Sequence, residues 1–174
     1  PSDMEAIAGM YWRASDMELR EVQLRNGKLR YVGNAIVSED LAALGDGKFH
    51  GPTTSSDLEI RGGRLIEVRG NQREEFPFVS KAVTLSPAEL AEFAGVYRLE
   101  EMDSEWTIAV DKTRLAISRL RAPTTGMVPQ LQDVFVFRLG PGGGTMRFTR
   151  GADRKIDGFV LKSGRIRNVR FRRL

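Results

Sequence analysis

The sequence contains no cysteine and only one histidine, His50. Disulfide scaffolds, cysteine nucleophiles and zinc sites built from thiolates or several histidines are therefore excluded. No run of about 18 apolar residues could span a membrane as a helix, and no basic start followed by a short apolar stretch indicates a signal peptide. The sequence predicts no metal ion and no cofactor, and it leaves the compartment undetermined.

The 174 residues are 41% hydrophobic and 29% charged, which suffices for the core of one ordinary domain or two small ones. Pro1 in place of an initiator methionine suggests a fragment or a processed product. The charge is uneven, because residues 147–173 carry ten Lys/Arg against two acids, whereas residues 1–146 carry 17 basic and 21 acidic residues. Such a basic end is typical of nucleic-acid binding, of contact with an anionic surface, or of a solvated sheet face.

An internal repeat organises the chain. The segment Ala8-Gly9-Met10-Tyr11 recurs as Ala94-Gly95-Val96-Tyr97, an offset of 86 residues. The same offset aligns further apolar residues: Val22 with Ile108, Leu24 with Val110, Leu29 with Leu115 and Phe49 with Phe135. We therefore predict two copies of one unit, over residues 1–84 and 85–174, with the boundary near Thr84.

Each copy opens with the pattern of a helix start. In Ser86-Pro87-Ala88-Glu89 the serine can cap the helix, the proline suits its first position, and the glutamate can reach back to the cap amide. Ser2-Asp3-Met4-Glu5 repeats this box without the proline. The apolar stretches that follow end at Gly9 and Gly95, so we expect a helix of one or two turns before the first strand of each copy.

Elsewhere the apolar residues alternate with period two, and short turn sequences separate the alternating segments. The turns are Asn26-Gly27, Arg61-Gly62-Gly63-Arg64, Asp111-Lys112-Thr113-Arg114 and Ser163-Gly164. Strands this short, joined by hairpin turns about every ten residues, indicate an all-β sandwich or a closed barrel in each copy. We predict two tandem small antiparallel β-barrels, each preceded by a short helix, because closure removes exposed strand edges.

The basic end of the chain is the first candidate site. Five arginines interleave with apolar residues in the last predicted strand: Arg165, Arg167, Arg170, Arg172 and Arg173. The alternation breaks at Asn168-Val169, which suggests a bulge. A solvated outer face is the favoured interpretation, and a patch for phosphate or another anionic surface is the alternative. Specific nucleic-acid binding is not predicted, because no zinc-finger, helix-turn-helix or RNA-binding motif accompanies the arginines.

The second candidate is a glycine-rich segment, made of Gly140, Pro141, Gly142, Gly143 and Gly144. It lacks the lysine and the following helix of a phosphate-binding loop, so we expect a flexible connection between strands that can reach away from its own barrel. A group of aromatic residues at strand positions is expected to fill the barrel ends or, alternatively, to line a ligand cavity. These residues are Tyr11, Trp12, Tyr97 and Trp106.

Several segments of the second copy occur in an order that resembles a known module. They are Leu90 to Tyr97, Met127 to Phe135, Met146-Arg147-Phe148, Ile156 to Phe159, and Val169-Arg170-Phe171. They resemble the lipocalin-like β-barrel modules on the carboxyl side of serine hydrolases of the β-lactamase and penicillin-binding-protein superfamily. The first copy is a looser version, and two barrels in tandem are most similar to the region that follows the catalytic domain in D-stereospecific aminopeptidases.

The catalytic motif of that superfamily is missing, because none of the ten serines is followed three residues later by a lysine. Lys112-Thr113-Arg114 has arginine where the superfamily strand motif has glycine. We therefore predict no catalytic residue. The resemblance implies an accessory region that packs on an upstream catalytic domain of the same polypeptide and shapes its substrate entrance, with residues 140–144 as the entrance loop. The alternative is a free-standing lipocalin-like protein that binds a small ligand, and a homodimer remains open.

Overall fold

A computed structural model describes residues 2–33, 37–51, 57–99, 101–139 and 142–174. The chain divides into two compact units, Pro1–Ala82 and Val83–Leu174, whereas the repeat in the sequence placed the boundary at Thr84. Both units are antiparallel β-barrels, one closed and one nearly closed, so the predicted all-β fold is confirmed. The short helices at the start of each unit were also predicted correctly.

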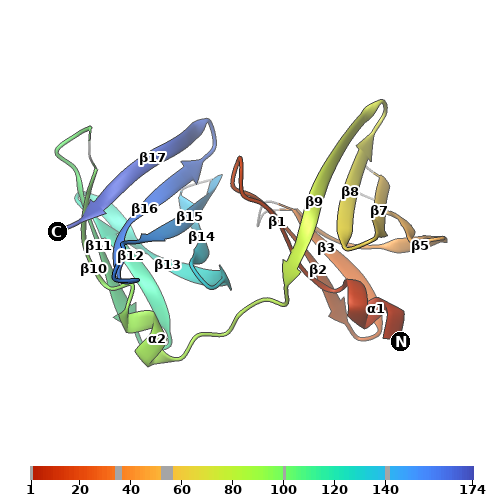
Figure 1. Cartoon of the computed structure of the whole chain (residues 1–174), viewed down its shortest axis with the longest axis horizontal. Coiled ribbons are helices and arrows are strands. Elements are labelled where there is room, and N and C mark those ends of the chain that lie inside the picture. The colour runs from red at the N-terminus through yellow and green to blue at the C-terminus, as the bar shows by residue number, and fades with distance from the viewer. Residues whose placement is uncertain (1, 34–36, 52–56, 100, 140–141) are drawn as a thin grey trace. The chain divides into compact units, whose positions relative to one another are not determined.

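The second unit is a closed barrel of eight strands in chain order (Figure 1). It begins with helix α2 (Pro87–Ala91). The strands are β10 (Gly95–Leu99), β11 (Glu105–Asp111), β12 (Arg114–Arg119), β13 (Ala122–Leu131), β14 (Val134–Leu139), β15 (Gly142–Arg150), β16 (Ile156–Ser163) and β17 (Ile166–Arg173). The last strand pairs with the first, with Tyr97 opposite Arg173, and this pairing closes the barrel.

The first unit follows the same path from helix α1 (Ser2–Ile7). Its strands are β1 (Gly9–Arg13), β2 (Glu18–Arg25), β3 (Lys28–Gly33), β4 (Val37–Asp40), β5 (Ala42–Gly45), β6 (Lys48–His50), β7 (Asp57–Arg61), β8 (Arg64–Arg69) and β9 (Gln72–Ser80). The sheet runs from β4 through β1 and β9 to β5. Only Leu41 separates the two edge strands, and its N–H donates to the carbonyl of Leu29. The edges are thus two halves of one bent strand, the counterpart of β13.

The turn chemistry that the sequence indicated is present. Asn26 and Gly27 have φ of 50° and 73° and join β2 to β3 in register, as expected for a two-residue hairpin. In α2 the N–H of Glu89 donates to Ser86 Oγ over 3.3 Å, and the N–H of Ser86 donates to Glu89 Oε2 over 2.8 Å. The predicted capping box of the second unit is therefore confirmed.

One tyrosine in each barrel ties the helix to the first strand. The hydroxyl of Tyr11 donates to the carbonyl of Ile7 over 2.6 Å, and the hydroxyl of Tyr97 donates to the carbonyl of Phe93 over 2.7 Å. Burial raises the pKa of both tyrosines to about 12. Because both pairs are separated by the 86-residue offset, this hydrogen bond is part of the repeated module.

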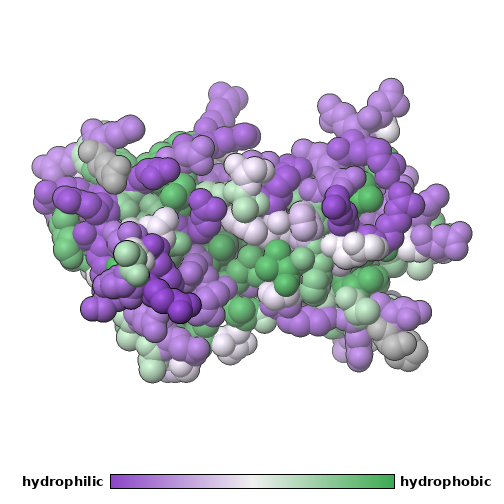
Figure 2. Space-filling view, viewed as in Figure 1, coloured by the Kyte–Doolittle hydropathy of each residue, from purple (hydrophilic) through white to green (hydrophobic). Residues whose placement is uncertain are grey.

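The core of the second barrel is aromatic. Phe159 stacks on Phe171 with ring centroids 4.4 Å apart, and Trp106 lies 4.8 Å from Phe171. Further rings complete the cluster: Phe93, Tyr97, Phe135, Phe137 and Phe148. The core of the first barrel is smaller and includes Tyr11, Leu65 and Phe76. Hydrophilic side chains cover most of the face of both units seen in Figure 2.

Candidate functional site

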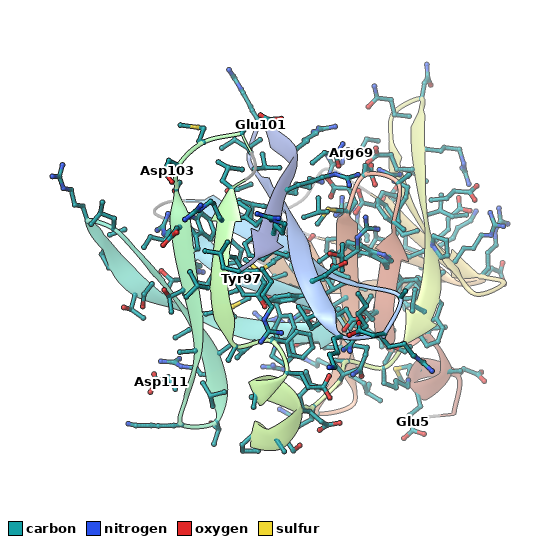
Figure 3. The ribbon with its side chains drawn as sticks, turned by 60° about the vertical axis from the view of Figure 1, so that its left-hand side comes forward. Glu5, Arg69, Tyr97, Glu101, Asp103 and Asp111 are labelled. Atoms are coloured by element: carbon teal, nitrogen blue, oxygen red, sulfur yellow. The ribbon has the colours of Figure 1, made fainter. Side chains whose placement is uncertain are left out.

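We call the end of each barrel away from its helix the distal end. In an antiparallel meander every second connection lies at the same end, so the connections β1–β2, β3–β4, β6–β7 and β8–β9 share the distal end of the first barrel. The connections β10–β11, β12–β13, β14–β15 and β16–β17 share that of the second. Figure 3 shows Glu101 and Asp103 at the distal end of the second barrel and Asp111 at the opposite end, and it shows Arg69 and Glu5 at opposite ends of the first.

A buried ion cluster lies inside the distal half of the first barrel. Glu67, on β8, is 2% exposed. Its Oε1 accepts a hydrogen bond from Arg20 Nε over 2.5 Å and another from the hydroxyl of Tyr31. Arg20 Nη1 also donates to Glu18 Oε2 over 2.7 Å. The charges are thus paired, as a buried ion needs to be.

The second carboxylate oxygen of Glu67 is buried but accepts no hydrogen bond from the described residues. Arg69 Nη2 is 3.7 Å from it, which is too far for a hydrogen bond. Burial is the largest single influence and lowers the pKa of Arg20, but the hydrogen bonds and charges of Glu67, Tyr31 and Glu18 together outweigh it, so the net shift is upward. Burial also raises the pKa of Tyr31, so the phenol stays protonated and remains a donor. One buried acceptor is therefore left over in this cluster.

The second barrel has apolar residues at the equivalent positions. Strand register matches Arg20, opposite Tyr11, with Trp106, opposite Tyr97. In the same way Tyr31 corresponds to Ile117 and Glu67 to Leu161. Gly51 stands 86 residues before Phe137, and a Cβ added to it would overlap the buried carboxylate of Glu39. The glycine makes room for an acidic side chain where the second barrel holds a ring.

The predicted arginine patch is only partly a surface. Arg165, Arg167, Arg170 and Arg172 are exposed. Arg173 instead donates to the carbonyls of Ala94, Glu92 and Ile156 over 2.5, 3.1 and 3.4 Å, so it secures the segment after the helix. The register between β16 and β17 shifts between Leu161 and Ser163, and Asn168 has a φ of 57°. A bulge is thus present, at Arg167-Asn168, one residue before the predicted Asn168-Val169.

A hollow of about 280 Å³ lies on the outer face of β16. Gly158 forms part of its floor, and Arg170, Arg172, Thr149 and Asp157 lie around it. Neither Arg170 nor Arg172 makes a side-chain hydrogen bond or ion pair within the described part of the chain, whereas Asp157 accepts a hydrogen bond from Thr149 over 2.6 Å. The hollow could hold a small anionic group, although the carboxylate beside it opposes one.

A second hollow, of about 360 Å³, lies beside α2 and includes Arg150 and Arg173 in its wall. Arg150 Nη2 is 2.9 Å from Asp133 Oδ1, and Arg150 Nη1 is 3.3 Å from Glu92 Oε2. Hydrogen bonding to Asp133 raises the pKa of Arg150, more than burial lowers it. Both arginines are thus committed to holding the barrel together, which favours a structural role for this hollow.

The glycine-rich segment differs from its prediction as a loop. Gly140 and Pro141 lie outside the described residues, whereas Gly142, Gly143 and Gly144 belong to β15 and pair with β14. A Cβ on Gly144 would lie 2.5 Å from Phe137 Cζ, so packing against an aromatic ring explains this glycine. The role of the segment at a substrate entrance stays a prediction.

The four aromatic residues do not line a common cavity. Tyr11, Tyr97 and Trp106 are buried in the two cores, whereas Trp12 is half-buried and belongs to neither core cluster. His50 is exposed, and its Nδ1 lies 2.8 Å from Asp57 Oδ1. In the described ranges no three His, Asp or Glu residues are grouped as metal ligands would be.

Comparison with models of known protein families gives no match, and a search of curated proteins gives none either. Among the described helices, both of which are short, none is suited to crossing a membrane. The buried ion cluster is the site that the sequence analysis missed. One feature of the sequence points to it: Glu67 comes two residues after Leu65 on β8, so both side chains face the barrel interior.

Proposed function

We propose that the chain is a non-catalytic accessory region of a serine hydrolase of the β-lactamase and penicillin-binding-protein type. In this role it packs on an upstream catalytic domain of the same polypeptide and shapes access to the active site. The packed aromatic core of the second barrel carries the proposal, because Tyr97 and Phe159 are at most 1% exposed and their rings lie 5.1 Å apart inside the barrel. In this proposal the outer surface of the barrel, not its interior, makes the functional contacts.

The sequence resemblance supports the same role, and so does the lack of a lysine three residues after any serine. The gene upstream of the Pro1 codon tests it first: we expect an open reading frame that encodes Ser-x-x-Lys. An upstream stop codon, or an unrelated domain, would contradict the proposal. A second test incubates the purified chain with D-amino-acid amides, cephalosporins and short-chain esters, and hydrolysis that copurifies with the chain would also contradict it.

A second candidate function, the binding of a small ligand, rests on the spare oxygen of Glu67 in the first barrel. The buried cluster favours a ligand with a hydrogen-bond donor over the apolar ligand of a typical lipocalin. Native mass spectrometry of the freshly purified chain tests this. A bound mass that is lost in Glu67→Gln but kept in the exposed control Glu75→Gln would support it. If only the mass of the unliganded chain were observed, binding of any small molecule from that expression host would be excluded.

A further inference from the structure

Three hairpin tips at the distal end of the second barrel each expose a large apolar side chain. Met102 lies on the β10–β11 connection, Leu120 on the β12–β13 turn and Ile166 at the β16–β17 turn. They are 66%, 86% and 52% exposed. Because all three connections lie at the same end of the meander, these side chains project from one end of a rigid barrel.

Two of these tips share one pattern, an apolar residue between two arginines. The β12–β13 turn has Arg119-Leu120-Arg121, and the β16–β17 turn has Arg165-Ile166-Arg167. Arg121, Arg165 and Arg167 are exposed and make no side-chain hydrogen bond or ion pair with described residues. Arg119 leans inward, with its guanidinium carbon 5.2 Å from the centre of the Trp106 ring.

The backbone of the β12–β13 turn is also unusual for an arginine. Arg121 has a φ of 57°, a conformation in which glycine or asparagine is usual and other side chains cost energy. The third tip differs, because Glu101 and Asp103 flank Met102. With Arg98 and Arg138 near the ends of β10 and β14 and Glu105 at the start of β11, the described part of the distal end holds six arginines against three carboxylates.

The first barrel has no such end in its described parts. Its described distal connections, residues 13–18 and 69–72, expose no large apolar side chain. Among its described residues, the large apolar side chains that are exposed are those of Leu44 and Val79, on the strand ends toward its helix. Among the distal connections that the structure describes, the pattern therefore occurs in the second barrel alone.

We propose that the distal end of the second barrel docks onto the surface of a bilayer that contains anionic phospholipid. Leu120, Ile166 and Met102 would enter the boundary between headgroups and acyl chains, where apolar side chains of surface-bound proteins reside. The exposed flanking residues Arg121, Arg165 and Arg167 would lie at the level of the lipid phosphates, where basic side chains are attracted to the negative surface. This goes beyond the accessory role and does not depend on it.

The arrangement favours a lipid surface over other anionic partners. The apolar side chains lie on separate tips with charged residues between them, whereas a protein partner needs a contiguous packed patch. A fluid bilayer accepts each tip separately. No fully exposed aromatic ring occurs in the part of the chain that is described, so the stacking contacts typical of single-stranded nucleic-acid binding are not provided there.

Vesicle cosedimentation of the 174-residue chain tests the proposal. We expect binding to phosphatidylcholine vesicles that contain phosphatidylglycerol, little binding to pure phosphatidylcholine, and loss of binding as salt is raised. The double variant Leu120→Ser/Ile166→Ser should weaken binding at least about tenfold, because partial burial of two such side chains is worth more than 1.4 kcal/mol. Arg165→Glu/Arg167→Glu should weaken it further at low salt.

The matched control is Val110→Ser/Val128→Ser, which removes two exposed apolar side chains of the same barrel away from the distal tips. This control should bind as the unchanged chain does, and tryptophan fluorescence should show all variants folded. Absence of binding to anionic vesicles at low salt would overturn the proposal. Equal binding by the Leu120/Ile166 variant would overturn it too, since the tips would then play no part.

Discussion

The two barrels follow the same chain path but fill their interiors in opposite ways. Both have a short helix, a tyrosine that bonds to the end of that helix, and eight strand positions in chain order. In the second barrel the positions of Trp106, Ile117 and Leu161 are apolar. The first barrel places Arg20, Tyr31 and Glu67 there and satisfies them mainly among themselves.

This difference shows that strand register and turns specify the module. The interior can be filled either by packed apolar side chains or by paired charged ones. The two solutions respond differently to change. An aromatic core loses stability gradually as volume is removed. A buried ion pair costs desolvation energy and contributes little net stability, but removal of one partner leaves an uncompensated charge. The first barrel should therefore be the more sensitive one to single substitutions at these positions.

The largest expected effect is that of Glu67→Leu, which places the residue of the second barrel into the first. Arg20 would remain buried without its main partner, and we expect a loss of about 3–5 kcal/mol in the stability of the first barrel. Arg20→Met and Tyr31→Phe added to Glu67→Leu should recover most of it, because the interior then becomes apolar throughout. Urea unfolding of the Trp106→Phe background, in which Trp12 is the only tryptophan and reports the first barrel, measures both.

The control for this series is Glu75→Leu, an exposed glutamate on β9 that pairs with Arg64 over 2.7 Å. Surface pairs of this kind contribute about 1 kcal/mol or less, so the midpoint should barely move. If Glu67→Leu behaved like Glu75→Leu, the ion cluster would have no part in specifying the first barrel. The reverse background, Trp12→Phe, lets Trp106 show that the second barrel is unaffected.

One glycine in each barrel allows the two interiors to be compared by a smaller substitution. Gly51→Ala would press on the buried carboxylate of Glu39 in the first barrel, and Gly144→Ala would press on the Phe137 ring in the second. Overpacking typically costs about 1–3 kcal/mol, and we expect both losses in thermal unfolding. Gly126→Ala is the control, since the atoms nearest to its Cβ would belong to the guanidinium of Arg114, at 3.2 Å, which can move aside. A neutral Gly144→Ala would show that Phe137 adapts easily.

The elements were predictable from the sequence because they rest on local rules. Asn26-Gly27 and the box at Ser86 each fix a turn or a cap by themselves, and the 86-residue repeat placed the strands of one copy on those of the other. The ion cluster was not predictable in the same way, because Arg20, Tyr31 and Glu67 lie on three strands up to 47 residues apart. The exposed face of Arg170 and Arg172 followed from alternation, whereas the inward role of Arg173 depends on closure of the barrel.

The tyrosine anchors should show how far the two modules are energetically alike. Tyr11→Phe and Tyr97→Phe each remove one hydroxyl and leave the carbonyl of Ile7 or of Phe93 without that donor. We expect each to cost its own barrel about 1 kcal/mol, in urea unfolding followed by the tryptophan of that barrel. If only one of the two variants lost stability, the two hydrogen bonds would share their geometry but not their contribution to the stability of the barrel.

The smallest expected effect is a pH dependence of the helix start in the second barrel. The hydrogen bonds from Ser86 hold the pKa of Glu89 below its usual value. The ionised carboxylate therefore adds stability above the pKa of about 4.3 that an unfolded glutamate has, and this contribution is lost as the pH falls through the lower pKa of the folded state. Glu89→Gln should remove that pH-dependent part while Tyr97 and the rest of the barrel stay unchanged. Acid unfolding followed by Trp106 measures it, and identical acid midpoints for the variant and the unchanged chain would show that the capping box fixes the geometry of α2 without stabilising the barrel.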